Sequence, residues 1–489
     1  MHSEIEKLVI TLLVMRSFSV LLGAPRACLD FREPTAVFRI MECTMREAVS
    51  AVLVHDEKLF VVRRQPYLLA FPGYIAFPGG KVDKEDFESE FDHPLLKDFP
   101  AYQIRALCRE LLEEIDFDLE LALEQDCVAS ISLLGTAVTP RFESVRFSVP
   151  HYKIELKQKP DIRVDNEEIA WSDWVVGSEL WQQFVDGGVL MVVPTQNIVR
   201  TLVADLSAQR VEPFNISYDH AVELPYLELM KGMGLIPVPS LTLPPARFTN
   251  ALRLGDSGSP VCLIDPSPKD SENFDKLLQT LQRYPVDRIL ITHHHRDHHQ
   301  QAPDLARHLD IPILCSACTE QRLKDSFGSD YLDDVSVELI HEGDFITHWQ
   351  GRTVRAYHLP GHDDGMMGLA PEDYSWFMVS DLVQTQGSVV IPEPEGEMQA
   401  YFNSMQRVIS LKPRVIIPAH GLPAGETWLL EQVLEHRMER ERQIKSLHQM
   451  GKNIDEMVGS IYIGLDQKLL PLAQQNVRQH LRKLGFYSE

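Results

Sequence analysis

Histidines gather in one short run of this chain, since five of the seven residues from 293 to 299 are histidines. Imidazole nitrogen is a good ligand for zinc and for other first-row transition metals. The run contains a His-x-His-x-Asp-His spacing, formed by His293, His295, Asp297 and His298. It follows residues 287–292, an apolar stretch that predicts a short buried strand, and open sheets place their sites at such strand ends. The run therefore predicts a metal site.

Three further potential ligands each come just after an apolar stretch that predicts a strand. The stretches are residues 353–357, 376–380 and 414–419, and the ligands that follow them are His362, Asp381 and His420. All three are residue types that can bind a metal.

These motifs together resemble the metallo-β-lactamase fold hydrolases, from about Leu243 to Leu422, with Asp265 as the first motif aspartate. The resemblance implies an αββα sandwich and two divalent transition-metal ions, with zinc expected first and iron or manganese as alternatives. It assigns His293, His295 and His362 to one ion, Asp297, His298 and His420 to the other, and Asp381 as the bridge. Asp297 would also be catalytic, and a metal-bound hydroxide would attack an ester or thioester.

Four residues depart from the family's small or glycine positions: Gln300, Gln301, Ser380 and Ala419. These changes reshape the edge of the pocket more than its metal ligands, so they leave the substrate open. His294 and His299 are extra histidines, which we expect to face away from the metals or to hydrogen-bond behind the ligands.

The N-terminal half carries a second cluster, on a helix predicted over residues 105–114. Glu110, Glu113 and Glu114 stand at i, i+3 and i+4 and therefore share one face of that helix. Carboxylates gathered on one face repel unless a cation or water screens them. A solvated acidic face is the alternative interpretation.

With the turn at residues 77–83, this helix resembles the Nudix box of diphosphate hydrolases. The resemblance implies an αβα domain in which Glu110, Glu113 and Glu114 bind magnesium or manganese, and Glu114 is catalytic. Gly79, Gly80 and Arg109 would bind substrate, and Arg109 would orient the box through ion pairs. The spacing between Gly80 and Arg109 exceeds that of the compact box, as in the coenzyme A diphosphatase branch. Glu85 or Asp86 replaces the early glutamate of the box, and Asp116 its late glycine.

The length of 489 residues and the 44% hydrophobic content allow several packed domains. We expect an N-terminal extension (1–44), a Nudix domain (45–208), a proline-bearing linker (209–242), a metallo-β-lactamase domain (243–424) and a helical tail (425–489). Residues 8–24 are apolar but interrupted by Arg16, which makes a poor signal peptide and a poor membrane span. The extension is interpreted as a misassigned start.

The tail predicts helices over 426–450, 454–459 and 470–484, and it resembles the winged-helix appendage of β-lactamase-like endoribonucleases. Either it positions a substrate or it is a helical buttress of the hydrolase, and the buttress is the favoured interpretation. The net charge of −24 disfavours a broad grip on nucleic acid. Seven cysteines, an odd number, suit a reducing cytoplasm. Cys315 and Cys318 form a lone pair that fits the end of a strand better than a zinc site.

The sequence thus predicts a cytoplasmic two-domain metallohydrolase acting on small molecules, with no membrane contact and an undetermined oligomeric state. The C-terminal site would cleave a thioester and the N-terminal site a nucleoside-diphosphate-linked compound, and a coenzyme A derivative would suit both. One alternative is that the dinuclear site cuts RNA. Another is that the Nudix half only senses a ligand.

Overall fold

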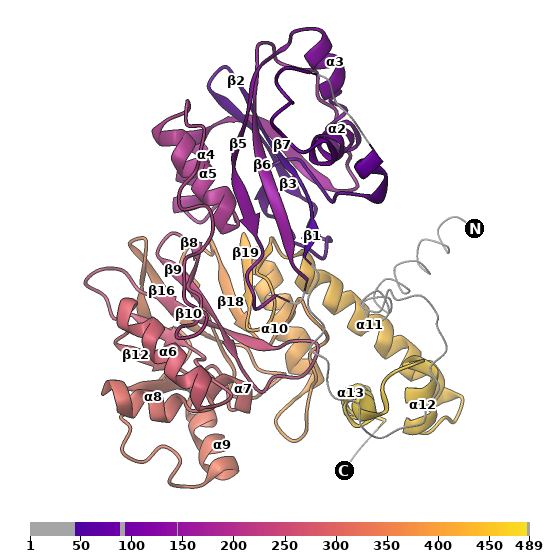
Figure 1. Ribbon diagram of the computed structural model, residues 1–489. Coiled ribbons are helices and arrows are strands. Elements are labelled where there is room, and N and C mark those ends of the chain that lie inside the picture. The colour runs from indigo at the N-terminus through magenta and orange to yellow at the C-terminus, as the bar shows by residue number, and fades with distance from the viewer. Residues whose placement is uncertain (1–44, 89–92, 144, 487–489) are drawn as a thin grey trace, which may run out of the picture. The chain divides into compact units, whose positions relative to one another are not determined.

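The computed structural model describes residues 45–88, 93–143 and 145–486 (Figure 1). The predicted N-terminal extension, residues 1–44, lies outside the described residues. The described chain consists of an N-terminal half with one sheet, a C-terminal half with two sheets, and a helical tail.

The N-terminal half is built on one mixed seven-stranded sheet with helices on both faces (Figure 1). Helices α2 (Ala101–Ile115) and α3 (Leu119–Glu124) pack on one face, and α4 (Gly177–Val185) and α5 (Val193–Ala204) on the other. The strands are β1 (Arg46–Glu47), β2 (Ser50–His55), β3 (Lys58–Arg64), β4 (Ile75–Ala76), β5 (Val128–Val138), β6 (Phe147–Leu156) and β7 (Ile169–Val176). Alternate residues of β2 and β3 face the two helical layers, so both faces of the sheet are buried. This is a three-layer αβα arrangement.

The C-terminal half has a seven-stranded sheet in the order β14-β13-β12-β11-β10-β9-β8 and a six-stranded sheet in the order β15 to β20. The first contains β8 (Leu227–Met230), β9 (Met233–Pro239), β10 (Phe248–Leu254), β11 (Cys262–Ile264), β12 (Arg288–Leu290), β13 (Ile313–Cys315) and β14 (Val337–Leu339). The second contains β15 (Phe345–Trp349), β16 (Arg352–His358), β17 (Met367–Pro371), β18 (Phe377–Ser380), β19 (Val415–Pro418) and β20 (Ala424–Gly425).

A shared apolar core joins these two sheets face to face. Leu252, Ile264 and Leu290 of the first sheet pack with Val354 and Met378 of the second. The outer face of the first sheet is covered by α6 (Ser271–Arg283), α8 (Ala302–Leu309) and α9 (Ala317–Phe327), and that of the second by α10 (Met398–Leu411) and the start of α11 (Trp428–Gln449). The predicted αββα sandwich is confirmed.

The segment predicted as a linker, residues 209–242, contains part of this sandwich. Strands β8 and β9 belong to the first sheet, and β9 pairs with β10 along its whole length. Proline has no backbone N–H, so it disrupts a strand only where that N–H would donate a hydrogen bond to a neighbouring strand. Pro237 and Pro239 lie on the part of β9 that extends beyond its pairing with β8, so only one side of the strand there forms a ladder. Pro237 and Pro239 therefore lie in a strand that is paired on one side, and not in a linker.

The tail is helical throughout its described part, residues 426–486. It comprises α11, α12 (Ile454–Ile461), a short 3₁₀ turn (Gln467–Leu469) and α13 (Leu470–Lys483), in agreement with the predicted helices. Asn453 caps α12 with a reciprocal side-chain bond to Glu456, which fixes where that helix begins. Ile444, Met457 and Val477 join the three helices in a core of their own.

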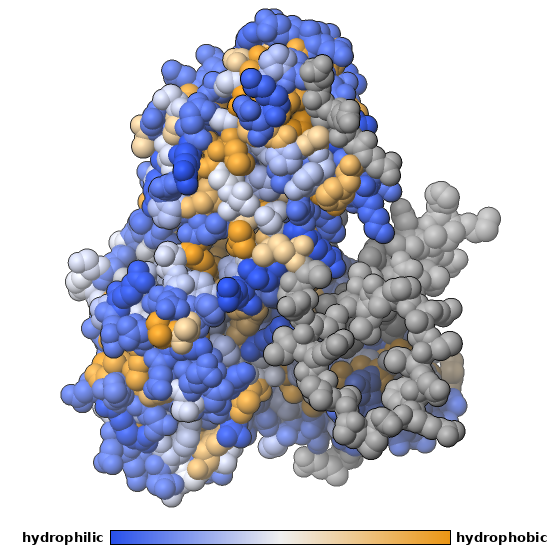
Figure 2. All heavy atoms as spheres, in the orientation of Figure 1, coloured by the Kyte–Doolittle hydropathy of each residue, from blue (hydrophilic) through white to orange (hydrophobic). Residues whose placement is uncertain are grey.

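The visible face of the molecule is mostly hydrophilic, with hydrophobic residues in small groups (Figure 2). None of the helices among the described residues combines the length and the apolar character needed to cross a bilayer. Cys315 is the last residue of β13 and is buried, while Cys318 hydrogen-bonds to Asp364, so the interpretation of this pair as a strand end agrees with the structure.

Candidate metal centre and acidic helix site

Turns at strand ends position every predicted ligand of the C-terminal site. Strands β11, β12 and β13 are parallel, so their carboxyl ends lie at one edge of the first sheet. The histidine run follows β12 and leads into the short helix α7 (Arg296–His299). The other three ligands, His362, Asp381 and His420, follow β16, β18 and β19 of the second sheet. The site therefore lies where the edges of the two sheets meet.

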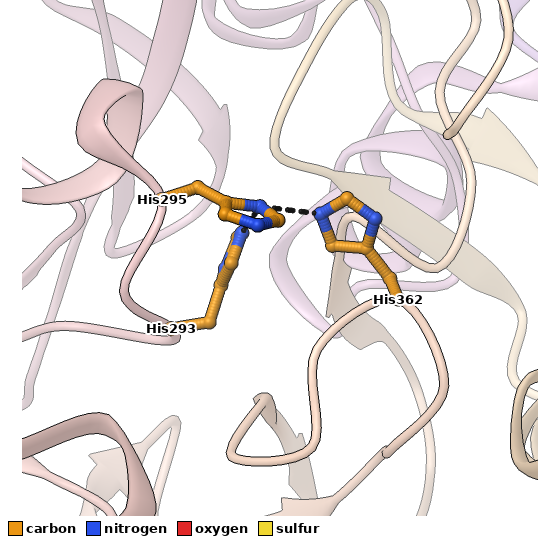
Figure 3. Close-up of side chains that lie close together, drawn as sticks. All are labelled: His293, His295 and His362. Carbon is orange, nitrogen blue, oxygen red and sulfur yellow. Dashed lines mark hydrogen bonds between the residues drawn. The ribbon is translucent and has the colours of Figure 1, made fainter. Parts of the chain in front are cut away.

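Three histidines form the first group, and their ring nitrogens point toward one another (Figure 3). His293 Nε2 lies 3.0 Å from His295 Nδ1, which lies 2.8 Å from His362 Nε2. Nitrogen atoms of this type gathered at such distances offer lone pairs to one cation. The three residues form a potential metal-binding group.

A second group forms beside the first, from Asp297, His298 and His420. His420 Nε2 lies 3.3 Å from Asp297 Oδ2, and His298 Nε2 lies 3.9 Å from Asp297 Oδ1. Asp381 lies between the two groups: its Oδ2 is 3.4 Å from His298 Nε2 and 3.6 Å from His362 Nε2, and its Oδ1 is 3.5 Å from His420 Nε2. All seven predicted ligands therefore meet in one place.

Each of the five histidines has a partner for the ring nitrogen that faces outward. Such bonds fix the tautomer and orientation of an imidazole, and they leave the inward nitrogen as an acceptor. The partners are Thr292 Oγ1 for His293 (3.1 Å), Glu395 Oε1 for His295 (3.2 Å), Val390 O for His362 (2.7 Å), Asp265 Oδ2 for His298 (2.8 Å) and Phe248 O for His420 (3.1 Å).

Charge in this site is balanced between histidines and aspartates. Burial and the neighbouring imidazoles hold the pKa of His293 well below its usual value and lower that of His362 to about 4. Burial alone would lower the pKa of His420, but the Asp381 and Asp297 carboxylates raise it to about 10. Burial would raise the pKa of Asp381, but His420 and His298 hold it well below its usual range. Two buried carboxylates thus demand positive charge beside them.

Several buried ligand atoms in the site lack a hydrogen-bond partner: His298 Nε2, His420 Nε2 and Asp381 Oδ1. Buried polar atoms almost always have a hydrogen-bond partner, and the exceptions mark functional groups or sites where an ion binds. These atoms converge between the two groups, and the donor set is nitrogen and carboxylate oxygen. The residues present therefore fit divalent transition metals.

The two extra histidines belong to neither of these two ligand groups, and each has a hydrogen-bond partner outside them. His294 Nδ1 bonds to Asp363, and His299 bonds to the Tyr331 hydroxyl (2.7 Å). Ser380, which stands at a glycine position of the family, has a positive φ of 49°. Its hydroxyl lies 2.8 Å from Thr292 Oγ1, so it ties the second sheet to the turn that begins the histidine run. Glu395 was not predicted from the sequence.

In the N-terminal half, the turn at Gly79 and Gly80 packs directly on α2. The Gly79 N–H donates to Glu114 Oε2 (2.8 Å), and a Cβ on Gly80 would lie 2.3 Å from Glu110 Oε2. A side chain at Gly80 would collide with that carboxylate, so glycine permits the close approach. The predicted turn and the predicted helix face are therefore in contact.

Arg109 is the centre of the ion pairs on this face. Its guanidinium donates to Glu110 (2.8 Å), Glu113 (3.2 Å) and Asp86 (3.0 Å). Of the two residues considered for the early acidic position, buried Asp86 is the one that contacts Arg109. Asp116, at the late glycine position, caps α2 in the left-handed conformation that favours glycine.

The carboxylates of α2 are short of positive charge. Burial raises the pKa of Glu114 to about 7, aided by Glu110 and Glu168 and opposed by the Gly79 N–H. Burial also raises the pKa of Glu110. Among the described residues, groups of three or more metal-binding side chains with ligand atoms within 4.8 Å occur at the C-terminal site, and the α2 glutamates are not among them. These glutamates face one surface without converging on a point.

Comparison with known proteins identifies two parts of the chain. Residues 244–420 match the metallo-beta-lactamase superfamily, and residues 454–485 match the beta-lactamase associated winged helix domain. The chain therefore contains a metallo-β-lactamase domain followed by the winged-helix domain associated with it, and the first of these is of a hydrolase superfamily.

The chain is 28% identical to the Beta-lactamase-like protein 2 homolog of Drosophila melanogaster over 254 residues, 48% of this chain and 82% of that protein. It is 26% identical to the Atrochrysone carboxyl ACP thioesterase of Aspergillus fumigatus over 200 residues, 40% of this chain and 58% of that protein. A crystal structure of a NUDIX hydrolase from Alicyclobacillus acidocaldarius covers 35% of this chain and 100% of that chain, at 21% identity and a TM-score of 0.31. The Nudix assignment of residues 45–208 stays a prediction.

Proposed function

We propose that the chain is a metal-dependent hydrolase whose C-terminal site binds two divalent ions and cleaves a thioester. The ligand groups would be His293, His295 and His362 for one ion and Asp297, His298 and His420 for the other, with Asp381 shared. The observation that carries the proposal is the convergence of buried ligand atoms that lack hydrogen-bond partners. When bound, the ions supply an activated water at neutral pH and polarise the scissile carbonyl.

The chain's own residues orient the reactants around those ions. Asp381 provides a negative charge between two groups of imidazoles and keeps both groups together. Asp297 is the more accessible carboxylate, and its Oδ1 lies farther from a histidine than its Oδ2 does. We assign to Asp297 Oδ1 the role of holding the attacking water. Because His298 and His420 keep the pKa of Asp297 low despite burial, it stays ionised for that role.

The name of one relative supports a thioester as the substrate. That relative is named the Atrochrysone carboxyl ACP thioesterase of Aspergillus fumigatus. A thiolate leaves readily at neutral pH, whereas the amine of an amide must first be protonated. Activation of water and polarisation of the carbonyl are therefore enough to cleave a thioester.

Hydrolysis of an acyl-coenzyme A by the protein loaded with zinc or manganese tests the proposal. We expect free coenzyme A to appear with the wild type and with Glu114→Gln, which alters only the other site, and to be lost with His295→Ala. A thiol reagent and mass spectrometry measure the product. If the wild type releases no coenzyme A, the thioester is wrong, and single-stranded RNA becomes the substrate to test.

We also propose that the N-terminal half hydrolyses a nucleoside-diphosphate-linked compound with magnesium. The contact of the Gly79–Gly80 turn with the α2 carboxylates favours it, because backbone N–H groups and acidic oxygens then lie beside one surface. The carboxylate donors, Glu110, Glu113 and Glu114, fit magnesium, whose preferred ligands are oxygen atoms. Magnesium keeps several waters and takes other ligands from the diphosphate, so widely spaced carboxylates suit it.

Formation of 3′,5′-ADP from the same acyl-coenzyme A tests this second activity. Glu114→Gln should abolish it, and His295→Ala should leave it unchanged. If no diphosphatase product forms while coenzyme A derivatives still bind to the N-terminal half, that half is a ligand sensor. The cytoplasmic location is a prediction from the sequence, and neither proposal depends on it.

A further inference from the structure

One loop, residues 389–396, lies between the first ligand group and the C-terminal tail. It follows Asp381 in the chain and precedes α10. From this loop, Val390 O accepts a hydrogen bond from His362 Nδ1 (2.7 Å), and Glu395 Oε1 lies 3.2 Å from His295 Nε2. Two of the three ligands in the first group therefore take their outward hydrogen bonds from a single loop.

The bond to Glu395 determines which nitrogen of His295 can bind a metal. A carboxylate accepts the proton of Nε2, and this leaves Nδ1 as the unprotonated nitrogen. His295 Nδ1 is the atom that lies against His293 and His362. A negative partner also makes the imidazole a stronger donor to a cation. Glu395 thus holds His295 in the tautomer and orientation that the site needs.

The tail holds this loop through buried side-chain amides. Asn476 Oδ1 accepts from the Ile391 N–H (3.0 Å), and Gln479 Nε2 donates to Gly396 O (2.9 Å) and Pro392 O (3.3 Å). Gln479 is 2% exposed and Asn476 is 8% exposed. Both amides belong to α13, so the winged-helix domain supplies hydrogen bonds that the loop backbone would otherwise lack.

Two arginines of the tail hold the loop at further points. The Arg437 guanidinium of α11, which is buried, donates to Val389 O. Arg482 of α13 forms an ion pair with Glu393 at 3.1 Å. The loop is therefore anchored to the tail at both of its ends and in the middle.

In the part of the chain that the structure describes, the histidines of the second ligand group take their outward bonds from elsewhere. His298 takes its outward bond from Asp265, after β11, and His420 from Phe248 O, at the start of β10. Both partners belong to the hydrolase sandwich itself. Two of the three histidines of the first group are thus oriented by the loop that the tail holds, whereas both histidines of the second group are oriented by the sandwich.

We infer that the C-terminal tail is a positioning element for one half of the metal centre, and that Glu395 is the positioning residue through which it orients His295. This inference rests on the proposed function, because it requires a metal at the first ligand group. It goes beyond that function by giving the tail a task inside the hydrolase centre. The sequence favoured the tail as a helical buttress of the hydrolase, and the inference specifies that it supports the loop of residues 389–396.

Glu395 could instead be a ligand itself, since its carboxylate, His294 and His295 also form a group within 4.8 Å. That arrangement would require His295 to bind one cation through Nδ1 and another through Nε2. An imidazole that binds through both nitrogens must lose its last proton, which is far costlier than donating it to a carboxylate. His294 is also bonded to Asp363 through Nδ1. The positioning role is therefore the better account.

Metal binding by the full chain tests the inference. The variants are Glu395→Ala, Glu395→Gln and Gln479→Ala, with exposed Glu372→Gln as the control for charge loss. Competition with a chromophoric chelator, using zinc alone, measures the affinity of each ion. We expect one of two ions to bind about 10- to 100-fold more weakly in Glu395→Ala, with smaller losses in the other two variants. The control and the second ion should be unchanged.

A matched variant of the other group makes the result selective. Asp265→Asn removes the carboxylate that accepts from His298 Nδ1, so it should weaken the other ion more than the first, which Asp265 reaches only through Thr292 and His293. The unfolding temperature of the metal-free protein should be the same in Glu395→Gln and wild type, which separates orientation of a ligand from general stability. If Glu395→Ala weakens both zinc ions equally, or leaves both affinities unchanged, the inference is overturned and the proposed function still stands. A third ion in the wild type that Glu395→Ala removes makes Glu395 a ligand and also overturns it.

A wild-type protein that binds no divalent ion overturns the inference together with the proposed function. Glu395→Ala could lower the zinc affinity of the first ligand group while Gln479→Ala leaves it unchanged. The tail would then not act on this group, and the inference would be overturned as stated. Circular dichroism of each variant shows whether the tail helices remain folded.

Discussion

In the C-terminal site buried aspartates lie among five histidines, whereas in the N-terminal site glutamates on one helix share Arg109. The first arrangement balances its charge with imidazoles, so Asp381 keeps a low pKa. The second does not, so burial raises the pKa of Glu114 to about 7. The first site converges on a point from two sheets, and the second spreads along a helix face. For the two functions proposed above, the contrast teaches that the fold alone assembles the C-terminal site, while the N-terminal surface would take its remaining magnesium ligands from substrate and water.

The largest expected effect is that of Asp381→Asn. Asp381 serves both ligand groups, so its loss should weaken both ions and reduce hydrolase activity by about 10³-fold or more. Steady-state thioester hydrolysis and metal content measure it. The N-terminal activity should not change. Retention of activity and of both ions would break the contrast, because the shared carboxylate would then be dispensable.

Glu114→Gln should have the next largest effect, on the N-terminal half. Glu114 is the carboxylate bonded to the Gly79 N–H, and we expect diphosphatase activity to fall by about 10²- to 10⁴-fold. Glu120→Gln, on α3 and paired with Arg105, is a matched control that should retain activity. An unchanged rate of 3′,5′-ADP release in Glu114→Gln would show that the helix face is only solvated.

Burial of Glu114 in the N-terminal half should make the stability of the chain depend on pH. The pKa of Glu114 rises from 4.5 to about 7 on folding, so between those pH values the folded chain holds a proton that the unfolded chain has lost. Without magnesium, the free energy of unfolding should therefore fall as pH rises through this window, by at most about 3 kcal/mol. Urea unfolding at several pH values measures it, with Glu114→Gln flattening the profile. Magnesium should remove the decline, because it binds the ionised carboxylate.

The smallest effect is expected for Arg109→Lys. Lysine keeps the charge but cannot bond Asp86, Glu110 and Glu113 at once, so the fixed fork of the guanidinium is lost. We expect a loss of about 1 kcal/mol in the free energy of unfolding and weaker magnesium binding. Calorimetry with magnesium measures both. Tighter magnesium binding in this variant would mean that Arg109 competes with the cation instead of orienting its ligands.

The sequence could predict which seven side chains lie together because they follow short apolar strands. Strand ends of one sheet lie at a common edge, so the position of His362 or His420 after a strand already places it near the histidine run. The helix face of Glu110 and Glu114 followed from helical spacing alone. Both predictions rest on residue spacing within a single helix or strand, which does not depend on the path of the rest of the chain.

The outward partners of the ligands were not predictable in this way. Glu395 contacts His295 across 100 residues, from a loop with neither helical nor strand spacing. Phe248 and Val390 act through backbone carbonyls, which every residue has, so their identity carries no signal. The path of the chain between elements determines these contacts. For the same reason the pairing of β8 and β9 with the sheet was missed where prolines suggested a linker.

The ligands of the centre come from both sheets of the sandwich, with the histidine run after β12 on one side and His420 after β19 on the other. An ion held there would cross-link two layers that otherwise meet through an apolar core. Binding to the folded state alone stabilises it in step with the supply of free ion. In cells short of the metal, the junction between the sheets would open more often at this edge. Proteases would then remove the idle protein faster than the loaded one, and metal supply would set its abundance.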